Sequence, residues 1–414
     1  MTAINHSSSV TVLAQRGLAD LLRHAFESFA FYRDRFRACN VSLDQDEGTV
    51  LAAMKTLDEA DLPILYAEAL ANHPRHHFLT DQTSGTTGHP KTRYSSRRDD
   101  LAEVDLCQEF FGGVGLDPNQ DVVLSLDIDS ADLYMFYGEA LKALGIEHVF
   151  GSVCADPISS IPSFGGVAPT TIISTPSILR SVLQLTEGRQ PLFRRLRRVI
   201  SVGEPMPAPL RKSFNRRRIE VFSFYGATEV GSIAGECQAH AGLHILDGGL
   251  ALTLRDTQER PTGIMGRAEW TTCHFLDQPL LNYDTHDTVI VVTEPCACGR
   301  ASARILDIRR RCDAFVLHGH TFWHSGFEQG LRVADVEPEF LQMIVSGHTM
   351  PHLVIRLPES LKTCASRIDR AVLARNDLGY FVERNLLTYE VEYAKSPIDT
   401  GRKLRRVIDN RTAP

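Results

Sequence analysis

Residues 83–91 read TSGTTGHPK, and this stretch decides which fold the chain is expected to adopt. Its glycines allow the backbone to approach a ligand closely, while its hydroxyls and its lysine offer hydrogen-bond donors and a positive charge. These properties suit a phosphate group, so the stretch predicts a nucleotide triphosphate loop. The residues expected to contact the phosphates are Thr83, Ser84, Gly85, Thr86, Thr87, Gly88 and Lys91.

The spacing of this stretch excludes a Walker A loop, in which a Gly-Lys pair is followed by Ser or Thr. Here Lys91 follows Pro90 instead of a glycine. The stretch resembles the phosphate-binding motif of the adenylate-forming superfamily, which includes acyl-CoA synthetases, peptide-synthetase adenylation domains and luciferases. Because runs rich in Ser, Thr and Gly are also common in ordinary loops, the identification depends on further motifs and on their order.

A second motif, SFYGATEVG at residues 223–231, resembles the next signature of that superfamily. The resemblance implies that Tyr225 lies against the adenine, that Thr228 contacts the α-phosphate and that Glu229 helps to hold Mg²⁺. Gly226 and Ala227 complete the nucleotide-binding segment. A triphosphate arrives with a hard cation, and such a cation prefers carboxylate and phosphate oxygens.

Three further segments match the family in the expected order. In LRRVISVGEPMP at 196–207, the resemblance assigns the adenine-side turn to Gly203 and Glu204. In NYDTHDTVIV at 282–291, it assigns to Asp287 the role of accepting hydrogen bonds from both ribose hydroxyls, an arrangement that is charge-assisted. In ILDIRRRCDAFVLHGHTFW at 305–323, Arg310 takes the place of the arginine that reaches the ribose.

The same resemblance predicts two domains, an adenylate-forming (AMP-binding) domain at 1–309 and a small mobile C-terminal lid domain at 310–414. The segment SPIDTGRKLRRVIDNR at 396–411 resembles the terminal lysine motif, whose cation stabilises charge that develops during adenylation. Counting backward from RRVID places the catalytic lysine at Lys403, whereas counting forward from Gly401 gives Arg402. We expect Lys403, because it keeps the residue type.

Within the superfamily, the chain looks most similar to the phenylacetate-CoA ligase branch, on account of LADLLRHAFESFAFYRDRF, RRVIDNR and CACGR. Some members of that branch bind zinc. The resemblance carries a structural Zn²⁺ site to Cys237, His244, Cys296 and Cys298, with His240 as a competing fourth ligand. A pair of free thiols beside a loop is the alternative interpretation.

Composition limits the classes of function. The chain has 414 residues, 43% of them hydrophobic and 23% charged, and this suits a globular protein of two domains. A net charge of −7 argues against a nucleic-acid partner.

No apolar run reaches the roughly 20 residues of a membrane-spanning helix, and the N-terminus lacks signal-peptide features. Nine cysteines without a framework pattern indicate reduced thiols. We therefore expect a cytoplasmic protein without a membrane partner.

The hydrophobic pattern predicts an α/β fold: a large N-terminal domain with parallel-type sheets and helices plus a small β subdomain, followed by a small α+β domain. Periodicity predicts an amphipathic helix over 11–31 and another over 177–186. Short strands are expected at 121–126, 170–174, 197–202 and 220–225, a β subdomain over 248–308, and a compact domain with PHLVIRL, a helix near 365–377 and LTYEVEYA.

The predicted activity has two stages, activation of a carboxylic acid by Mg·ATP to an acyl-adenylate and transfer of the acyl group to a thiol, by default that of CoA. Tyr134, Phe136 and Tyr137 are candidate pocket walls for an aromatic acid, and core packing is the alternative role for these rings. Two other functions stay open: a natural-product ligase that delivers the acyl group to a carrier protein or an amine, and a non-catalytic nucleotide-binding relative. A homodimer is also left open.

Overall fold

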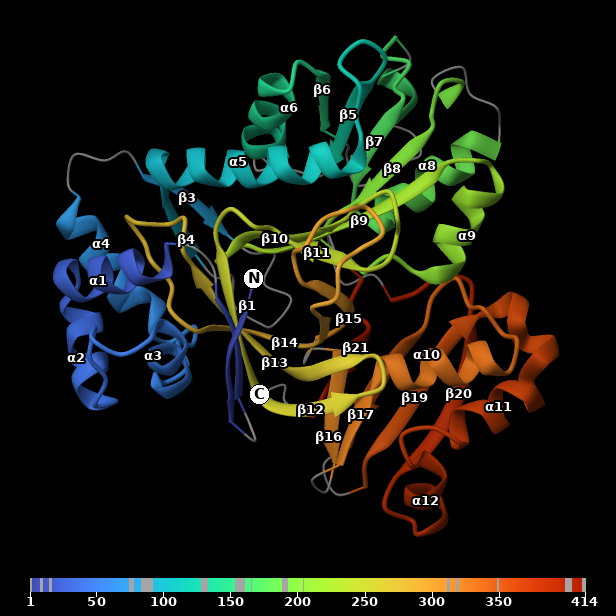
Figure 1. Cartoon of the computed structure of the whole chain (residues 1–414). Helices are drawn as coiled ribbons and strands as arrows, with labels where there is room; N and C mark the ends of the chain where they lie inside the picture. Colours follow the sequence, from blue (N-terminus) through green and yellow to red (C-terminus); the bar gives the residue numbers. More distant parts are fainter. Residues whose placement is uncertain are drawn as a thin grey trace. The chain divides into compact units, whose positions relative to one another are not determined.

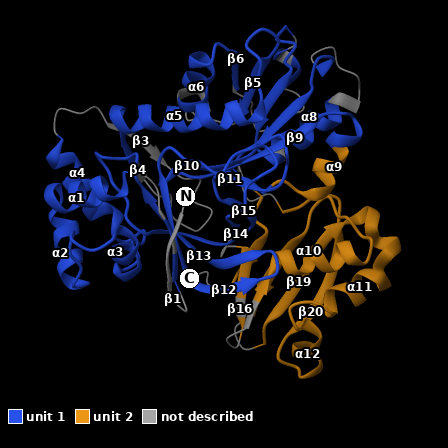
Figure 2. Cartoon of the chain, viewed as in Figure 1, with its two compact units in different colours: residues 1–205, 214–308 blue, residues 206–213, 309–414 orange. Residues whose placement is uncertain are grey.

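The computed structural model describes residues 2–7, 10–14, 17–73, 78–82, 92–127, 133–152, 161–164, 166–187, 193–203, 205–310, 313–317, 320–347, 350–398 and 404–411. The chain divides into two compact units (Figure 2). The first comprises Met1–Pro205 and Phe214–Ile308, and the second comprises Met206–Ser213 and Arg309–Pro414. Assignment of the two predicted domains to an adenylate-forming body and a mobile lid stays a prediction.

One mixed sheet of thirteen described strands forms the frame of the first unit, in the order β1-β2-β12-β13-β14-β15-β11-β10-β9-β8-β7-β5-β6 (Figure 1). The strands are β1 (Thr2–Ser7), β2 (Val10–Ala14), β5 (Val122–Asp127), β6 (Glu147–Ser152), β7 (Thr171–Ser174), β8 (Arg198–Ser201), β9 (Glu220–Ala227), β10 (Gly231–Glu236), β11 (Leu243–Ile245), β12 (Leu250–Arg260), β13 (Gly263–Thr272), β14 (Tyr283–Val292) and β15 (Arg304–Arg310).

The half of the sheet from β6 to β9 is parallel, and this confirms the four strands predicted there. Parallel strands need crossover connections, which α8 (Pro176–Glu187) and α9 (Ala208–Arg216) supply before β8 and β9. Because helices cover both faces of such strands, their side chains are buried on both faces, and every residue of β7 is buried.

The other half of the sheet is antiparallel and corrects one prediction. Residues 10–14 form β2, which pairs with β1 and β12, whereas the sequence predicted a helix from residue 11. Thr11 and Leu13 are both buried, and their separation matches the two-residue period of a strand. The helix begins only at Leu18, and β12, β13 and β14 are longer than the short strands expected over 248–308.

Helices cover the sheet in two groups, and each group encloses a core. The helices α1 (Leu18–Ser28), α2 (Ala30–Ala38), α3 (Glu47–Ala53) and α4 (Leu62–Asn72) share a core with the antiparallel half that includes Tyr32 and Trp270. The helices α5 (Arg97–Val114) and α6 (Glu139–Ala143), the π-helical turn η1 (Leu133–Gly138) and the 3-10 turn η2 (Ile161–Phe164) lie beside the parallel half. Figure 1 shows α5 running across β10, on a core that contains Phe110 and Phe222.

The second unit is an α+β structure, as predicted. Its sheets are the hairpin β16 (Ala314–Leu317) and β17 (His320–Trp323) and the four strands β20 (Thr388–Ala394), β19 (His352–Pro358), β18 (Gln342–Ser346) and β21 (Val407–Asp409). Its helical segments are α10 (His324–Val333), η5 (Glu359–Cys364), α11 (Ala365–Leu373) and α12 (Leu378–Glu383). The predicted strands at PHLVIRL and LTYEVEYA and the helix near 365–377 are confirmed.

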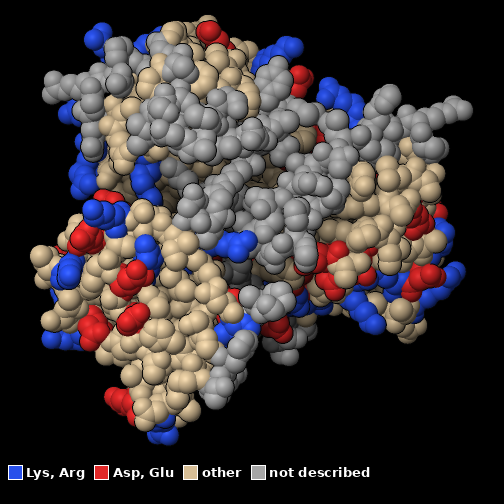
Figure 3. Space-filling view, turned by 180° about the vertical axis from the view of Figure 1, so that it is seen from behind, with Lys and Arg blue, Asp and Glu red and all other residues tan. Residues whose placement is uncertain are grey.

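The described surface carries both signs of charge. On the face drawn in Figure 3, Lys and Arg side chains are interspersed with Asp and Glu side chains. Among the helices that the structure describes, none is both long enough and apolar enough to span a bilayer.

Close packing of α5 on β10 requires glycine at residue 235, because a Cβ atom there would lie 2.1 Å from the ring of Phe110. We expect Gly235→Ala to lower the free energy of unfolding by about 1–3 kcal/mol, as overpacked core substitutions do. Urea unfolding would measure the change.

The matched control is Gly112→Ala, on the exposed side of α5, where an added Cβ meets nothing within 4 Å. This substitution is expected to be neutral or to stabilise the protein by up to about 1 kcal/mol, because alanine favours helix. Equal effects of the two substitutions would contradict the close packing of α5 on β10.

Candidate functional site

The motif at 223–231 forms the end of β9 and a tight turn into the antiparallel strand β10. Glycine is required on both sides of this turn. A Cβ on Gly226 would lie 2.8 Å from the carbonyl oxygen of Gly231, and Gly231 itself has φ 84° and faces the Glu103 carboxylate. Glu103, from α5, accepts hydrogen bonds at 2.8 Å from both the backbone N–H and the hydroxyl of Ser232. Glu103 thus holds the end of the turn that follows Thr228 and Glu229.

Two hydrogen bonds cross between this motif and β14. The hydroxyl of Tyr225 donates to a carboxylate oxygen of Asp287, and the hydroxyl of Tyr283 donates to Glu229 at 2.9 Å. All four side chains are buried, with exposed fractions between 1% and 7%. Each segment therefore contributes one tyrosine and one carboxylate, and the predicted Mg²⁺ ligand and the predicted ribose ligand lie in one buried group.

These contacts show that the sheet is strongly curved. In the strand order, β9 and β14 are four steps apart, and a flat sheet would separate them by about 19 Å. A tyrosine side chain is much shorter than that. The sheet must therefore curl so that side chains from its antiparallel part meet the end of its parallel part, as the contact of the Tyr225 and Trp270 rings, 6.4 Å between centroids, also requires.

The protonation states suit this arrangement. Burial, together with the charge of Glu229, raises the pKa of Tyr283 far above its usual value, so its hydroxyl stays a donor. Hydroxyl donors stabilise the charged form of a carboxylate. Carboxylate oxygens can coordinate a hard cation or accept hydrogen bonds from vicinal hydroxyls.

The other predicted nucleotide ligands differ in how much of them the structure describes. Gly203, with φ 75°, follows β8 at the carboxyl end of the parallel strands, which is where open α/β sheets bind ligands. Arg310 is the last residue of β15, and its side chain is not described. Ala227 ends β9.

Several predicted residues lie outside the described part of the chain: Glu204, Arg402, Lys403 and the whole phosphate motif from Thr83 to Lys91. The strands that border this motif are described. They are β3 (Phe78–Gln82) and β4 (Thr92–Ser96), which pair antiparallel with Gln82 opposite Thr92. The motif therefore connects the two strands of a hairpin, directly before α5.

The candidate pocket residues lie beside an aromatic group. Phe136 and Tyr137 are half-buried and pack against the core of the parallel half. The Tyr137 ring meets Phe224 edge-on at 5.7 Å, and Phe224 stacks on Phe110 at 4.3 Å. The side chain of Tyr134 is not described. Tyr137 therefore has the packing contacts of a core residue, and its role as a pocket wall stays a prediction.

The site includes two aromatic residues that the sequence reasoning missed. Phe224 is the neighbour of Tyr225 in its motif, and Tyr283 is the aromatic residue four positions before Asp287. The signal that could have identified Tyr283 is its place at the start of an already recognised motif.

A second cluster joins thiols and an imidazole. Ligand atoms of Cys237, His244, Cys296 and Cys298 all lie within 4.8 Å of one another. The sulfurs of Cys237 and Cys296 are 3.8 Å apart, and Cys298 Sγ lies 3.4 Å from His244 Nε2. Tetrahedral zinc with bonds of about 2.3 Å to sulfur would place its sulfur ligands about 3.8 Å apart.

The imidazole in this cluster has a fixed orientation. His244 Nδ1 lies 2.9 Å from the hydroxyl of Ser302, so that Nε2 faces the thiols. Burial and the nearby arginines lower the pKa of His244 to about 4, and the ring is neutral at pH 7, as a ligand must be. The competing ligand His240 instead packs on Phe222, with ring centroids 4.8 Å apart.

Comparison with solved structures supports the fold. A 2-hydroxyisobutyryl-CoA ligase in the postadenylation state, in complex with R3-HIB-AMP, has a TM-score of 0.70 and 18% identity, with 95% of this chain and 88% of that chain covered. An anthranilate CoA ligase in complex with anthranoyl-AMP has a TM-score of 0.56 and 16% identity, with 80% of this chain and 66% of that chain covered. The o-succinylbenzoate CoA synthetase of Bacillus subtilis, in complex with the acyl-adenylate OSB-AMP, has a TM-score of 0.52 and 17% identity, with 79% and 67% covered.

A search of curated proteins found no significant match. The family model described as AMP-binding enzyme matches residues 2–278, which is more than half of the chain. That match confirms the superfamily inferred from the motifs, while the phenylacetate-CoA ligase branch stays a prediction. With its motifs in order, its acyl-CoA ligase fold and this family match, the chain belongs to the AMP-binding enzymes.

Proposed function

We propose that the protein activates a carboxylic acid with ATP and passes the acyl group to the thiol of CoA. In the first stage a carboxylate oxygen attacks the α-phosphorus of ATP, the bond to the β-phosphate breaks, and acyl-adenylate and pyrophosphate form. In the second stage the thiolate attacks the carbonyl carbon and AMP leaves. The observation that carries the proposal is the buried group in which Tyr225 and Tyr283 bind Asp287 and Glu229.

In this mechanism each ligand residue has one task. Asp287 accepts hydrogen bonds from the ribose hydroxyls, Thr228 donates to the α-phosphate, and Arg310 reaches the ribose. Glu229 holds Mg²⁺, which when bound neutralises phosphate charge. The motif at 83–91, with Gly203 and Glu204 on the adenine side, completes nucleotide binding, and Lys403 stabilises the charge that develops at the α-phosphate.

Transfer requires the lysine to leave, so we assign to the second unit the role of a lid that turns about residues 310–313 between the two stages. Hinge motions of this kind are common in ligases that expose one site to two reactions. The cytoplasm, where ATP and reduced thiols coexist, is the expected location. A carrier-protein thiol or an amine is the alternative acceptor.

An aromatic acid is the substrate class that the site favours. Tyr137, Phe224 and Phe110 form a continuous edge-on and stacked group next to the motif strand β9. Phe224 and Phe110 are buried in the core, so the half-buried Tyr137 is the ring of this group on which a flat acid would gain contact area, and an aromatic pair adds about 0.5–1.5 kcal/mol beyond its burial.

The first test is ATP–pyrophosphate exchange with Mg²⁺ and a panel of aryl, fatty and amino acids, without CoA. We expect exchange with at least one aryl acid, because adenylate formation is reversible and needs no acceptor. Protein that is folded and binds ATP but shows no exchange across the panel would contradict the proposal and favour a non-catalytic relative.

The role of Lys403 is tested in the same assay. Lys403→Ala is expected to abolish exchange while sparing thioester formation from a supplied acyl-adenylate, because the lysine acts only in the first stage. Lys395→Ala, an exposed lysine nearby in the sequence, is the matched control and should leave both stages intact. If Arg402→Ala reproduced the defect and Lys403→Ala did not, the working cation would be Arg402.

We also propose that Cys237, His244, Cys296 and Cys298 hold a structural Zn²⁺. Their mutual distances suit tetrahedral ligation, and such a site joins the start of the β10–β11 connection to residues 296–298 before β15. Metal analysis should find about one zinc ion per chain.

Cys298→Ser and His244→Ala should lower both the zinc content and the melting temperature, because ligation contributes to folding. Cys39→Ser, outside the cluster, is the control and should change neither. Protein purified without chelators that contains no zinc would refute the site.

A further inference from the structure

Asp287 lies in an irregular part of β14. Arg267 of β13 pairs with Thr288, and Glu269 pairs with Asp284, so the single residue Ala268 lies opposite residues 285–287. Such bulges bend a strand and re-aim its side chains, and they are common next to active sites. The residue that the proposed function assigns to the ribose is thus presented by a bulge.

The bulge contains a left-handed residue that its neighbour holds. His286 has φ 60°, a conformation that is uncommon for a residue other than glycine. The carboxylate of Asp284 accepts the backbone N–H of His286 at 2.7 Å and lies 3.5 Å from its Nδ1 atom. Burial alone would raise the pKa of Asp284, but the contacts with His286 and Arg267 outweigh it and lower the pKa to about 2.

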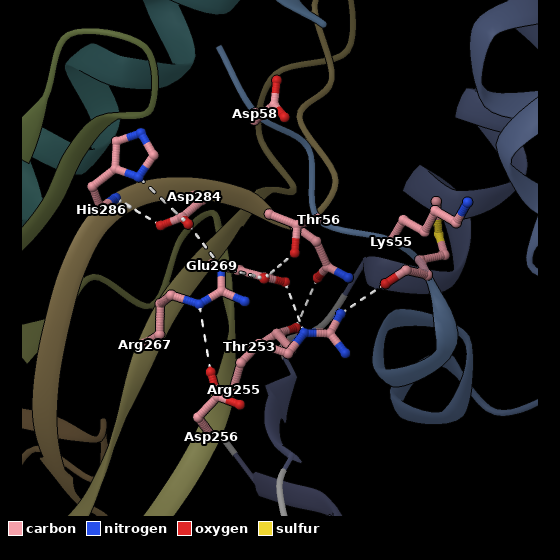
Figure 4. Close-up of polar contacts among 12 residues, drawn as sticks. Lys55, Thr56, Asp58, Thr253, Arg255, Asp256, Arg267, Glu269, Asp284 and His286 are labelled. Atoms are coloured by element: carbon pink, nitrogen blue, oxygen red, sulfur yellow. Dashed lines mark hydrogen bonds and ion pairs between the residues drawn. The ribbon is translucent and has the colours of Figure 1, made fainter. Parts of the chain in front are cut away.

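A chain of alternating charges extends from this carboxylate (Figure 4). Arg267 Nη1 lies 2.7 Å from Asp284 and 3.1 Å from Glu269. Glu269 has no exposed surface, and it also accepts from Arg255 Nε at 3.0 Å and from the hydroxyl of Thr56. Arg267 and Glu269, the two residues that flank Ala268 on β13, therefore both belong to this row of alternating charges.

At the other end of this row of charges, Arg255 binds backbone carbonyl oxygens. The Arg255 guanidinium donates to the carbonyl oxygens of Ala52 at 2.6 Å, Met54 at 2.7 Å and Leu51 at 3.2 Å, at the C-terminal end of α3. Cations are favoured at this end of a helix. Every charge in the row is paired, and the row connects the bulge to the end of α3.

We propose that Asp284, Arg267 and Glu269 are positioning residues that clamp the bulge so that Asp287 meets the ribose hydroxyls. The inference rests on the proposed function of Asp287. Buried ion pairs give little net stability compared with apolar packing, whereas they can specify one geometry. A clamp of this kind should determine how strongly the enzyme distinguishes ribose from deoxyribose.

The test measures dissociation constants of AMP and 2′-deoxyAMP by calorimetry on the full chain, without an acid substrate. We expect the wild type to prefer AMP by about tenfold or more, since a hydrogen bond to a charged group is lost with the hydroxyl. Asp287→Ala should remove this preference. Asp284→Ala should reduce it toward unity, and Asp284→Asn should restore part of it, because an amide oxygen can still accept the His286 N–H.

Asp256→Ala is the matched control. Asp256 lies 3.8 Å from Arg267 Nε, but its side chain is 81% exposed and it does not touch the bulge (Figure 4). Its removal should leave the preference for AMP unchanged. Circular dichroism melting would establish that each variant is folded, and Arg267→Gln, which removes the same clamp from the other side, serves if Asp284→Ala does not fold.

The outcomes separate the two claims. A wild type that binds AMP and 2′-deoxyAMP equally would overturn the role of Asp287 and with it this inference. A preference that disappears in Asp287→Ala but persists in folded Asp284→Ala or Arg267→Gln would leave the proposed function intact and overturn the clamp. A purely structural role would lower melting temperatures without changing the preference.

Discussion

The candidate site depends on two hydrogen bonds that cross between distant strands, from Tyr225 to Asp287 and from Tyr283 to Glu229. Neither can form in a flat sheet, because β9 and β14 are four strand positions apart. The curvature that brings them together places the last parallel strand beside an antiparallel strand. The carboxylates of Asp287 and Glu229 are then both buried and bound by tyrosine hydroxyls.

Packing of α5 supports the same geometry. This helix supplies Glu103 to the turn after the SFYGATE strand and Phe110 to the surface of β10, and glycines at 231 and 235 leave room for both side chains. Since α5 begins directly after the hairpin that carries residues 83–91, the helix connects the phosphate motif to the turn of Thr228 and Glu229.

Features set by short stretches of sequence could be predicted, and features set by distant segments could not. The parallel strands, the motifs and the set Cys237, His244, Cys296 and Cys298 follow from local patterns or from a family resemblance. The hairpin β1–β2 was missed because a short strand followed closely by a helix was interpreted as one helix. The bulge clamp joins Arg255 to carbonyl groups more than 200 residues away, and no local pattern indicates such a contact.

The clamp also changes how the departure from the family pattern at residue 286 is interpreted. The family that the motifs resemble usually has glycine directly before this aspartate, and histidine there favours the non-catalytic alternative. However, His286 occupies the left-handed region that glycine favours, and Asp284 accepts a hydrogen bond from its N–H. The backbone that a glycine would provide is therefore retained with different side chains, and the substitution gives no argument for loss of activity.

Arg255, Glu269, Arg267 and Asp284 alternate in sign, and the row contains two positive and two negative groups. Removing one member leaves a buried charge without compensation, which typically costs about 3–5 kcal/mol. A change at one of the four residues therefore affects its charged neighbours, and the carbonyl groups at the end of α3 are bound to the row through Arg255. By this reasoning the end of α3 is coupled to the bulge that carries Asp287, although α3 contains none of the motifs.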